Sequence, residues 1–290
     1  MLTYSLNKLY RSIGLSKQAF HQHMDRYMQE RSIEEQILLI VYHVREDHPT
    51  MGLRDIYYKI APIDIGRDRF EILCKQSGLT VERKHNLQRT TDSSGVIRFD
   101  NLLSGLVINK PNQVWQSDIT YYQLNGRYYY ITFIIDAFTR VIVGHAVSQR
   151  LKTEQTTLPA LQKAIKSRMD LNLSIHALIF HSDGGGQYYD KDFLSLTKKH
   201  KINSSMCLYP WENGKAERIN GIIKNNYLIH RIIHSFEQLQ TEVDRSVLLY
   251  NTEKPHIMLQ RKCPIQFENE YLCINNSIEN TNRVSTETNY

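Results

Sequence analysis

The stretch QVWQSDITYYQLNGRYYYITFIIDAFTRVIVGHAVS, residues 113–148, decides the fold. It is rich in Val, Ile, Tyr, Phe and Thr, which favour β-strands over helices. Short turns divide it into three β-rich runs, at residues 113–123, 127–140 and 141–148. Three such runs joined by short turns predict an antiparallel meander.

Downstream of this meander the pattern changes to alternating helices and strands. Amphipathic segments predict helices at residues 153–168, 190–200, 214–230 and 236–251. Between them, apolar segments predict a buried strand at residues 176–183 and a short strand at residues 203–209. A meander followed by such alternation implies a mixed five-stranded sheet with helices on its faces, an α/β fold.

Residues 1–90 have a different character and are predicted to be entirely helical. Residues 6–30 contain two helical stretches separated by a Gly-Leu-Ser break, and Ser16 is a plausible N-cap of the second stretch. This order is typical of a helix-turn-helix. A second copy of the pattern is predicted to follow, with helices over residues 34–47, 49–60 and 66–78. Helical packing units that do not touch DNA share this pattern, so both interpretations remain open.

The remaining segments complete the predicted domain organisation. Residues 91–112 lose their periodicity and are interpreted as a linker that ends near Pro111. The α/β domain is predicted to span residues 113–273, and the polar residues 274–290 are predicted to be a disordered tail.

Composition narrows the class of protein. The chain has 290 residues, a net charge of +6 and a pI near 9.0, which favours a polyanionic partner. Residues 198–231 carry seven Lys or Arg residues and only two acidic ones. No apolar run approaches the roughly 20 residues that span a bilayer, and the N-terminus lacks a secretory h-region, so we expect no membrane partner and a cytoplasmic location. The four cysteines show no disulfide or metal-binding spacing.

Three acidic residues lie where side chains converge in such a sheet: Asp118 in the first strand, Asp183 at the end of the fourth, and Glu217 on the following helix. Any one of them alone could be structural. Three carboxylates close together cannot all ionise unless a cation neutralises them, and their hard oxygens suit Mg²⁺ or Mn²⁺. Two such ions can activate an attacking hydroxyl and stabilise a leaving oxygen in phosphoryl transfer.

Four strings, VWQSDIT, IIDAFTRVIVG, HSDGGGQY and NGKAERINGIIK, resemble the catalytic core of DDE transposases and retroviral integrases, specifically the second reading frame (OrfB) of the bacterial IS3 family. The spacing of 33 residues between Asp183 and Glu217 is close to that of the family. The resemblance implies an RNase H-like core in which Asp118, Asp183 and Glu217 bind two Mg²⁺ or Mn²⁺ ions.

The resemblance also indicates residues that would hold DNA. Lys224 lies seven residues after Glu217, where the family has a basic residue, and nearly two helical turns place both on one helix face. Lys215 and Arg218 flank Glu217 on the same helix. Lys17 and Gln18 open the second helix of the helix-turn-helix, so they too are expected to contact DNA.

The resemblance implies a transposase that cuts and joins DNA, with the terminal repeats of its element and a target DNA as partners. We expect a homo-oligomer on DNA, a nucleoid-associated bacterial location, and an upstream reading-frame product (OrfA) as a further partner. Two other interpretations stay open. One is an RNase H-like nuclease without strand transfer, and the other is an inactive copy that serves as a DNA-binding regulator.

Several other residues have more ordinary interpretations. Asp136 is predicted to fix a turn, and Trp115 to belong to the core. His181 is predicted to support the site without acting in it. Tyr209 and Trp211, in the loop before the catalytic helix, could touch DNA.

Overall fold

The computed structural model describes residues 6–81 and 99–274. These residues form two compact units: a smaller one from residues 6–47 and 51–81, and a larger one from residues 48–50 and 99–274. Residues 91–98 of the predicted linker, and the predicted tail beyond residue 274, lie outside the described residues. The predicted limits of those segments therefore stay predictions.

The smaller unit is helical. Its helices are α1 Leu6–Ser12, α2 Lys17–Asp47, α3 Leu53–Ile60 and α4 Arg67–Gln76. As predicted, Ser16 caps α2: its Oγ accepts a hydrogen bond from the backbone N–H of Ala19 at 3.1 Å. The prediction of a separate helix from residue 34 was wrong, because α2 runs unbroken for 31 residues. No Gly or Pro interrupts residues 17–47, so nothing in this segment ends the helix.

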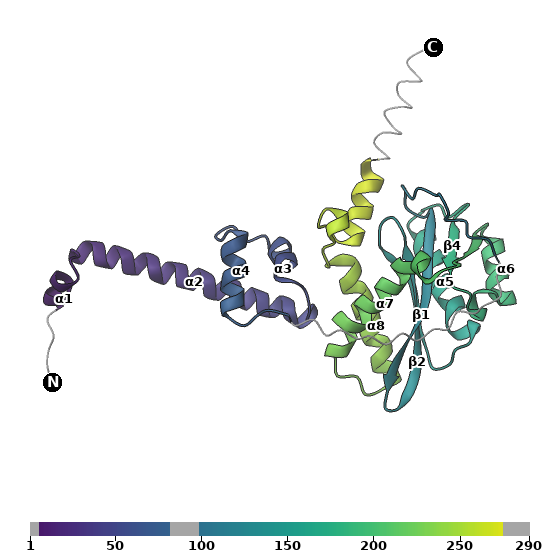
Figure 1. Cartoon of the computed structure of the whole chain (residues 1–290), viewed down its shortest axis with the longest axis horizontal. Helices are drawn as coiled ribbons and strands as arrows, with labels where there is room; N and C mark the ends of the chain where they lie inside the picture. The colour runs from purple at the N-terminus through teal and green to yellow at the C-terminus, as the bar shows by residue number, and fades with distance from the viewer. Residues whose placement is uncertain (1–5, 82–98, 275–290) are drawn as a thin grey trace, which may run out of the picture. The chain divides into compact units, whose positions relative to one another are not determined.

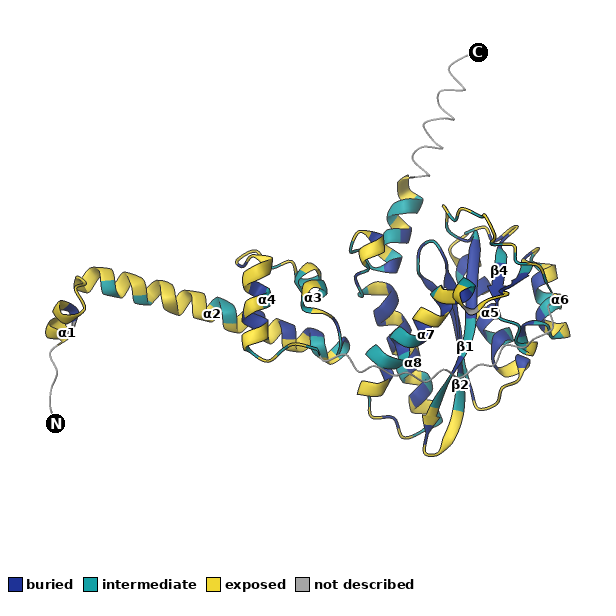
Figure 2. Cartoon of the chain, viewed as in Figure 1, coloured by how far each residue is buried: buried dark blue, intermediate teal, exposed yellow. Residues whose placement is uncertain are grey.

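The core of the smaller unit involves only the C-terminal half of α2. Ile37, Val41 and Val44 pack there against buried residues of α3 and α4, including Ile56 and Phe70. Figure 2 shows that the N-terminal half of α2 is largely exposed.

The larger unit contains a five-stranded mixed sheet, as predicted. Its strands are β1 Val114–Leu124, β2 Arg127–Asp136, β3 Ile142–Ser148, β4 Ile179–Ser182 and β5 Asn203–Met206. Their order is β3-β2-β1-β4-β5. The first three strands pair antiparallel, whereas β4 pairs parallel with β1 and with β5. This is the arrangement of the RNase H-like fold, and it places β1 in the middle of the sheet.

Helices cover both faces of the sheet, as Figure 1 shows. One face packs against α7 Gly214–Asn226 and α8 Phe236–Thr252, through a core that includes Phe133, Ile219 and Val243. The other face packs against α5 Thr157–Asp170 and α6 Lys191–Lys199, through a core that includes Trp115, Leu161 and Phe193. Short 3₁₀ turns are found at η1 Thr153–Gln155, η2 Gly186–Tyr188, η3 Pro210–Asn213, η4 Leu228–His230 and η5 Ile257–Leu259.

Residues 264–274 form a final helix for which no separate prediction was made. It begins at Pro264, where a proline is well tolerated because the first helical N–H needs no partner. A buried ion pair joins this helix to α5: Arg168 Nη1 lies 2.7 Å from Glu268 Oε2.

Two structural predictions for single residues are confirmed. Trp115 is fully buried. Asp136 ends β2 and organises the turn to β3: its Oδ1 accepts hydrogen bonds from the backbone N–H groups of Phe138 and Thr139, both at 2.8 Å. Among the described residues, none of the four cysteines forms a disulfide bond. Within the described residues, no helix has the length and apolar character needed to cross a bilayer.

Candidate active site

The parallel pairing of β1 and β4 brings Asp118, inside β1, and Asp183, directly after β4, together. The last register partners of this pair are Ser117 and Ser182, and each aspartate is the next residue along the chain. Neighbouring strands lie about 4.8 Å apart, which places the two carboxylates side by side where the sheet opens. Both side chains are half-buried.

The glycines after Asp183 leave room for its carboxylate. Gly185 N donates to Asp183 Oδ1 at 3.1 Å, and a Cβ atom on Gly185 would lie only 3.0 Å from that oxygen. A Cβ atom on Gly184 would lie 2.7 Å from Met206 Cε. None of the three glycines at 184–186 has a positive φ, so the segment needs glycine mainly for space beside the carboxylate.

Helix α7 brings Glu217 to the same place. Asn220 Nδ2 donates to Asp118 Oδ2 at 2.8 Å, and Lys224 Nζ donates to Thr120 Oγ1 at 3.3 Å. Residues 217, 220 and 224 share one helix face, so this face lies over the Asp118 and Thr120 side of β1. Asn220 was missed in the sequence, although its position three residues after Glu217 could have indicated it.

The acidic residues repel one another. Burial first, then the charge of Asp183, then that of Glu217 raise the pKa of Asp118 to about 7, against the lowering effect of its hydrogen bonds. Burial also raises the pKa of Asp183, and the Gly185 hydrogen bond opposes this. The residues of the site therefore do not neutralise all of the negative charge of its carboxylates.

The arrangement fits a hard cation through the two aspartates. Asp118 inside β1 and Asp183 directly after β4 both offer carboxylate oxygens, which Mg²⁺ or Mn²⁺ prefers. Within residues 6–81 and 99–274, however, no three His, Cys, Asp or Glu side chains gather closely enough to enclose a metal ion. Glu217 is exposed. Its carboxylate would have to turn toward the aspartates to complete the site.

Lys224 lies over β1, where its Nζ donates to Thr120, two residues after Asp118. It is half-buried, and its Nζ lies 4.9 Å from the centre of the Tyr121 ring. Burial lowers the pKa of Lys224. This position on the carboxylate face of β1 leaves the predicted phosphate contact untested, but compatible with the geometry.

Two amide side chains attach the loop before α7 to β1. Gln116 Nε2 donates to the Glu212 carbonyl at 3.1 Å, and Asn213 Nδ2 donates to the Ser117 carbonyl at 2.9 Å. The segment leading to Asp118 is thus tied to the segment leading to Glu217. These contacts join residues almost a hundred positions apart, and no local sequence signal predicts them.

The aromatic pair before α7 lies open to solvent. Tyr209 and Trp211 stack face to face, with ring centroids 4.5 Å apart and an interplanar angle of 4°. Their side chains are 52% and 73% exposed. The predicted contact of these rings with DNA stays a prediction.

His181 lies beneath the site, as expected for a supporting residue. It is fully buried, and its Nδ1 lies 2.9 Å from Ser205 Oγ. Burial lowers the pKa of His181 to about 4, so the imidazole is neutral near pH 7.

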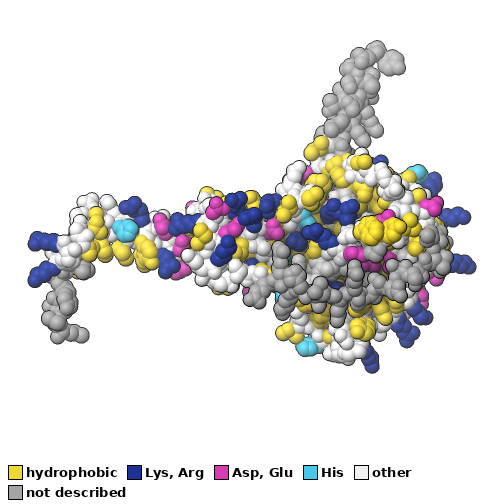
Figure 3. Space-filling model, viewed as in Figure 1, with side chains coloured by type: hydrophobic (Ala, Val, Ile, Leu, Met, Phe, Trp, Pro, Cys, Tyr) yellow, Lys and Arg dark blue, Asp and Glu magenta, His cyan; other side chains and the backbone are white. Residues whose placement is uncertain are grey.

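The other predicted DNA-binding residues fall in two places. Lys215 is half-buried and Arg218 is exposed, both near the start of α7. Figure 3 shows Lys and Arg side chains at several separate places on the visible face of the larger unit, among hydrophobic and acidic side chains. Lys17 and Gln18 belong to the smaller unit, where both are exposed at the start of α2. Their roles stay predictions.

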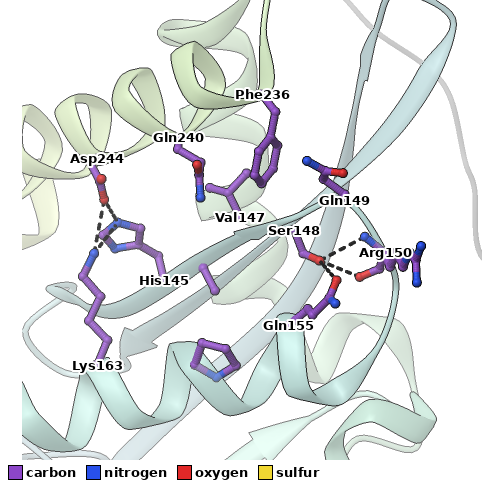
Figure 4. Close-up of a pocket in the computed structure, with 12 residues that line it drawn as sticks. His145, Val147, Ser148, Gln149, Arg150, Gln155, Lys163, Phe236, Gln240 and Asp244 are labelled. Atoms are coloured by element: carbon purple, nitrogen blue, oxygen red, sulfur yellow. Dashed lines mark hydrogen bonds and ion pairs between the residues drawn. The ribbon is translucent and has the colours of Figure 1, made fainter.

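A second group of ionisable side chains lies at a pocket on the outer strand β3, shown in Figure 4. The pocket has a volume of about 660 Å³ and is lined by residues of β3, α5 and α8. His145 Nε2 lies 2.5 Å from Asp244 Oδ1, and Lys163 Nζ lies 3.2 Å from the same oxygen. This pocket contains none of the three acidic residues above, so it is a separate feature.

Comparisons with known proteins agree with this geometry. The family described as integrase core domain matches residues 108–208, and a second family of the same description matches residues 201–264. Together they span more than half of the chain. Among solved structures, the catalytic core domain of HTLV-2 integrase in complex with magnesium is 21% identical, with a TM-score of 0.43, and the match covers 55% of this chain and 97% of that one.

Curated relatives come from insertion elements. An uncharacterised 31 kDa protein of insertion element IS600 from Shigella sonnei is 28% identical, over 87% of this chain and 92% of that protein. Transposase InsF for insertion sequence IS3A from Escherichia coli is 30% identical over 172 residues. That match covers 56% of each chain. On these sequence matches, with the mixed sheet and the paired aspartates, the chain belongs to the IS3 family of insertion-sequence transposases and carries an integrase core domain.

Proposed function

We propose that this protein cleaves DNA at the ends of its insertion element and transfers the freed strand to a target, with Asp118, Asp183 and Glu217 as the ligands of two Mg²⁺ or Mn²⁺ ions. The observation that carries the proposal is the parallel pairing of β1 and β4, which sets Asp118 beside Asp183. Burial first, and then the charges of Asp183 and Glu217, raise the pKa of Asp118 to about 7. Such repulsion is costly unless a cation is bound, and active sites concentrate perturbed groups of this kind.

The bound ions would activate the attacking oxygen and stabilise the leaving oxygen. The chain's own residues position these groups. Asp118 and Asp183 hold their carboxylates on paired strands, and Asn220 orients Asp118 through its amide hydrogen bond. Lys224, on the same helix face as Glu217, would hold a phosphate oxygen of the reacting strand.

The proposed reaction has two displacements at phosphorus and needs no covalent enzyme intermediate. In the first, water attacks, the P–O3′ bond breaks, and a 3′ hydroxyl is freed. In the second, that hydroxyl attacks a target phosphodiester and displaces its 3′ oxygen. Strand transfer joins two DNA molecules, so we propose that the protein works as a homo-oligomer on DNA, together with an upstream reading-frame product. DNA as the substrate places its action at the bacterial nucleoid.

The test uses the full chain and labelled DNA that carries the element's ends, with Mg²⁺ or EDTA, and with or without the upstream product. Asp183→Asn removes one ligand charge with little change in shape, so it should abolish nicking and joining while DNA binding is retained. Asp190→Asn is a matched control. Asp190 caps α6, its Oδ1 accepts from Asp192 N at 2.9 Å, and Asn caps equally well.

The products separate the alternatives. Metal-dependent nicking and joining that Asp183→Asn loses and Asp190→Asn keeps would support the proposal. Nicking without any joined product would favour the nuclease, and binding without cleavage in every sample would favour the regulator. Unchanged nicking by Asp183→Asn would overturn the assignment of the metal ligands.

A further inference from the structure

Arg140, in the turn between β2 and β3, has a strained backbone conformation. Arg140 has φ of 66°, in the left-handed region where a side chain costs roughly 1–2 kcal/mol and glycine costs little. The turn does not need the Arg140 side chain, because the carboxylate of Asp136 binds the N–H groups of Phe138 and Thr139. An arginine at such a position suggests that its guanidinium has a function other than stabilising the turn.

Two further cations lie close to Arg140, both from the start of α7. The charge of Arg218 acts on Arg140, and the charge of Arg140 acts on Lys215. The acid that acts on both Arg140 and Lys215 is Asp136, whose two carboxylate oxygens already accept backbone hydrogen bonds. In the part of the chain that the structure describes, these three side chains form no hydrogen bond or ion pair. The cluster is thus a concentration of positive charge that a bound anion would neutralise.

Neutral polar groups lie beside the cations. The Tyr250 ring is buried, is affected by the charges of Arg140 and Arg218, and contacts the His256 ring with centroids 5.0 Å apart. His256 Nε2 is buried and makes no hydrogen bond among the described residues. A phenol and an imidazole next to cations are groups that hydrogen-bond an anion.

The cluster lies near the acidic site on the α7 side. Ala137 N, in the same turn as Arg140, donates to the Val114 carbonyl at 2.9 Å. Val114 precedes Asp118 by four residues on β1, which corresponds to about 13 Å of strand. One strand of duplex DNA carries a phosphate about every 3.4 Å of helix axis. If the phosphate that is cut lies at the acidic residues, a phosphate of the same DNA strand only a few nucleotides away would therefore lie at the cluster.

We propose that Arg140, Lys215 and Arg218 form a binding site for a backbone phosphate of the substrate DNA, a few nucleotides from the bond that is cut. The proposal rests on the proposed function, because it takes DNA at the acidic site as given. Arg140 is the new member of the set. Its guanidinium presents paired donors to two phosphate oxygens, while Lys215 and Arg218 supply further charge.

The test measures DNA binding by the full chain without chemistry. Fluorescence anisotropy with a labelled duplex of the element's end, in EDTA and over a range of salt, compares wild type with Arg140→Gln, Arg140→Gly and Lys215→Gln. Loss of one phosphate contact should lower the magnitude of the salt slope by about 0.9 and weaken binding about tenfold. Arg140→Gly relieves the strained φ, so its thermal midpoint should stay near that of wild type and exclude unfolding as the cause.

Lys166→Gln is the matched control, because Lys166 is exposed on α5, which packs against the opposite face of the sheet. It removes the same charge and should leave the salt slope unchanged. If Arg140→Gln binds DNA with the same affinity and the same salt slope as Lys166→Gln, the proposal is wrong, even if wild type cleaves DNA. Wild type that neither binds nor cleaves DNA would instead refute the proposed function and this inference together.

Inorganic phosphate separates a DNA site from a site for a free anion. At equal ionic strength, phosphate and chloride should give similar thermal midpoints for wild type if the cluster requires a DNA strand. A phosphate-dependent rise that Arg140→Gly abolishes, with no change in DNA binding, would assign the cluster to a small anion and overturn the proposal.

Discussion

Asp118 links the chemistry of the site to the stability of the fold. Its carboxyl ordinarily ionises near pH 3.8, and in the folded protein its pKa is about 7. Between these values the folded state binds more protons than the unfolded state, so this group lowers stability as pH rises. Asp118→Asn should therefore raise the free energy of unfolding at pH 8.5 without metal, by about 1–4 kcal/mol, and abolish cleavage.

Urea unfolding in EDTA at pH 5.5 and pH 8.5 checks this prediction. The gain should be about half as large at pH 5.5, midway between the two pKa values, as at pH 8.5, above both of them. Asp190→Asn, outside the site, should show no such difference between the two pH values. An equal effect of Asp118→Asn at both pH values would contradict the stated origin of the pKa shift.

Lys224 gives a second prediction for a single residue. Lys224→Ala removes a half-buried cation from the carboxylate face of β1, so we expect about tenfold weaker binding to the element's end and a salt slope smaller by about 0.9. Anisotropy titrations measure both quantities, with Lys166→Ala as the control. If neither quantity changes, Lys224 is simply a helix residue packed on Tyr121.

The sequence predicts single residues where chemistry and spacing coincide, and misses them where distant segments meet. Asp118, Asp183 and Glu217 combine residue type with characteristic intervals, although their role as ligands stays a prediction. Asn213 donates a hydrogen bond to Ser117, and the charge of Arg218 acts on Arg140, in both cases over a long separation in the chain. No local pattern records such contacts, so only the folded structure shows them.

Among the elements, β3 and α5 approach each other closely at Gly144. A Cβ atom there would lie 2.3 Å from the carbonyl oxygen of Ala160 and 2.7 Å from Ala164 Cβ, neither of which can move alone. Gly144→Ala should therefore destabilise the larger unit by about 1–3 kcal/mol. Thermal unfolding measures this, and Gly186→Ala is the control, because nothing lies within 4 Å of a Cβ there. Equal midpoints for both variants would refute the close packing.

Strands were easier to predict than helix limits. The meander was predicted to within a few residues, because period-two and β-branched patterns survive in buried strands. Helix α2 was divided wrongly, because a change in hydrophobic pattern was interpreted as a break although no helix-ending residue was present. No prediction was made for the helix of residues 264–274, although a proline is well tolerated at the first position of a helix.

For the larger unit as a whole, the ion pair between Arg168 and Glu268 ties the last described helix to α5. The two side chains are 2% and 4% exposed, so removing one partner leaves a buried group without its counter-charge. Arg168→Met should cost about 3–5 kcal/mol, whereas Arg168→Met with Glu268→Leu should cost much less. Urea unfolding of the single and double variants tests this. A double variant no more stable than the single one would contradict the prediction.

The position of β1 in the sheet affects how the protein loses activity on heating. The strand that carries Asp118 lies in the middle of the sheet, with β2 on one side and β4 on the other. Inner strands exchange their amide hydrogens last and open only when the whole domain does. This aspartate therefore cannot be lost by local fraying, as a ligand on a loop could be. Heating should abolish catalysis and unfold the domain in one step. The residual activity would then measure the fraction of molecules that are still folded.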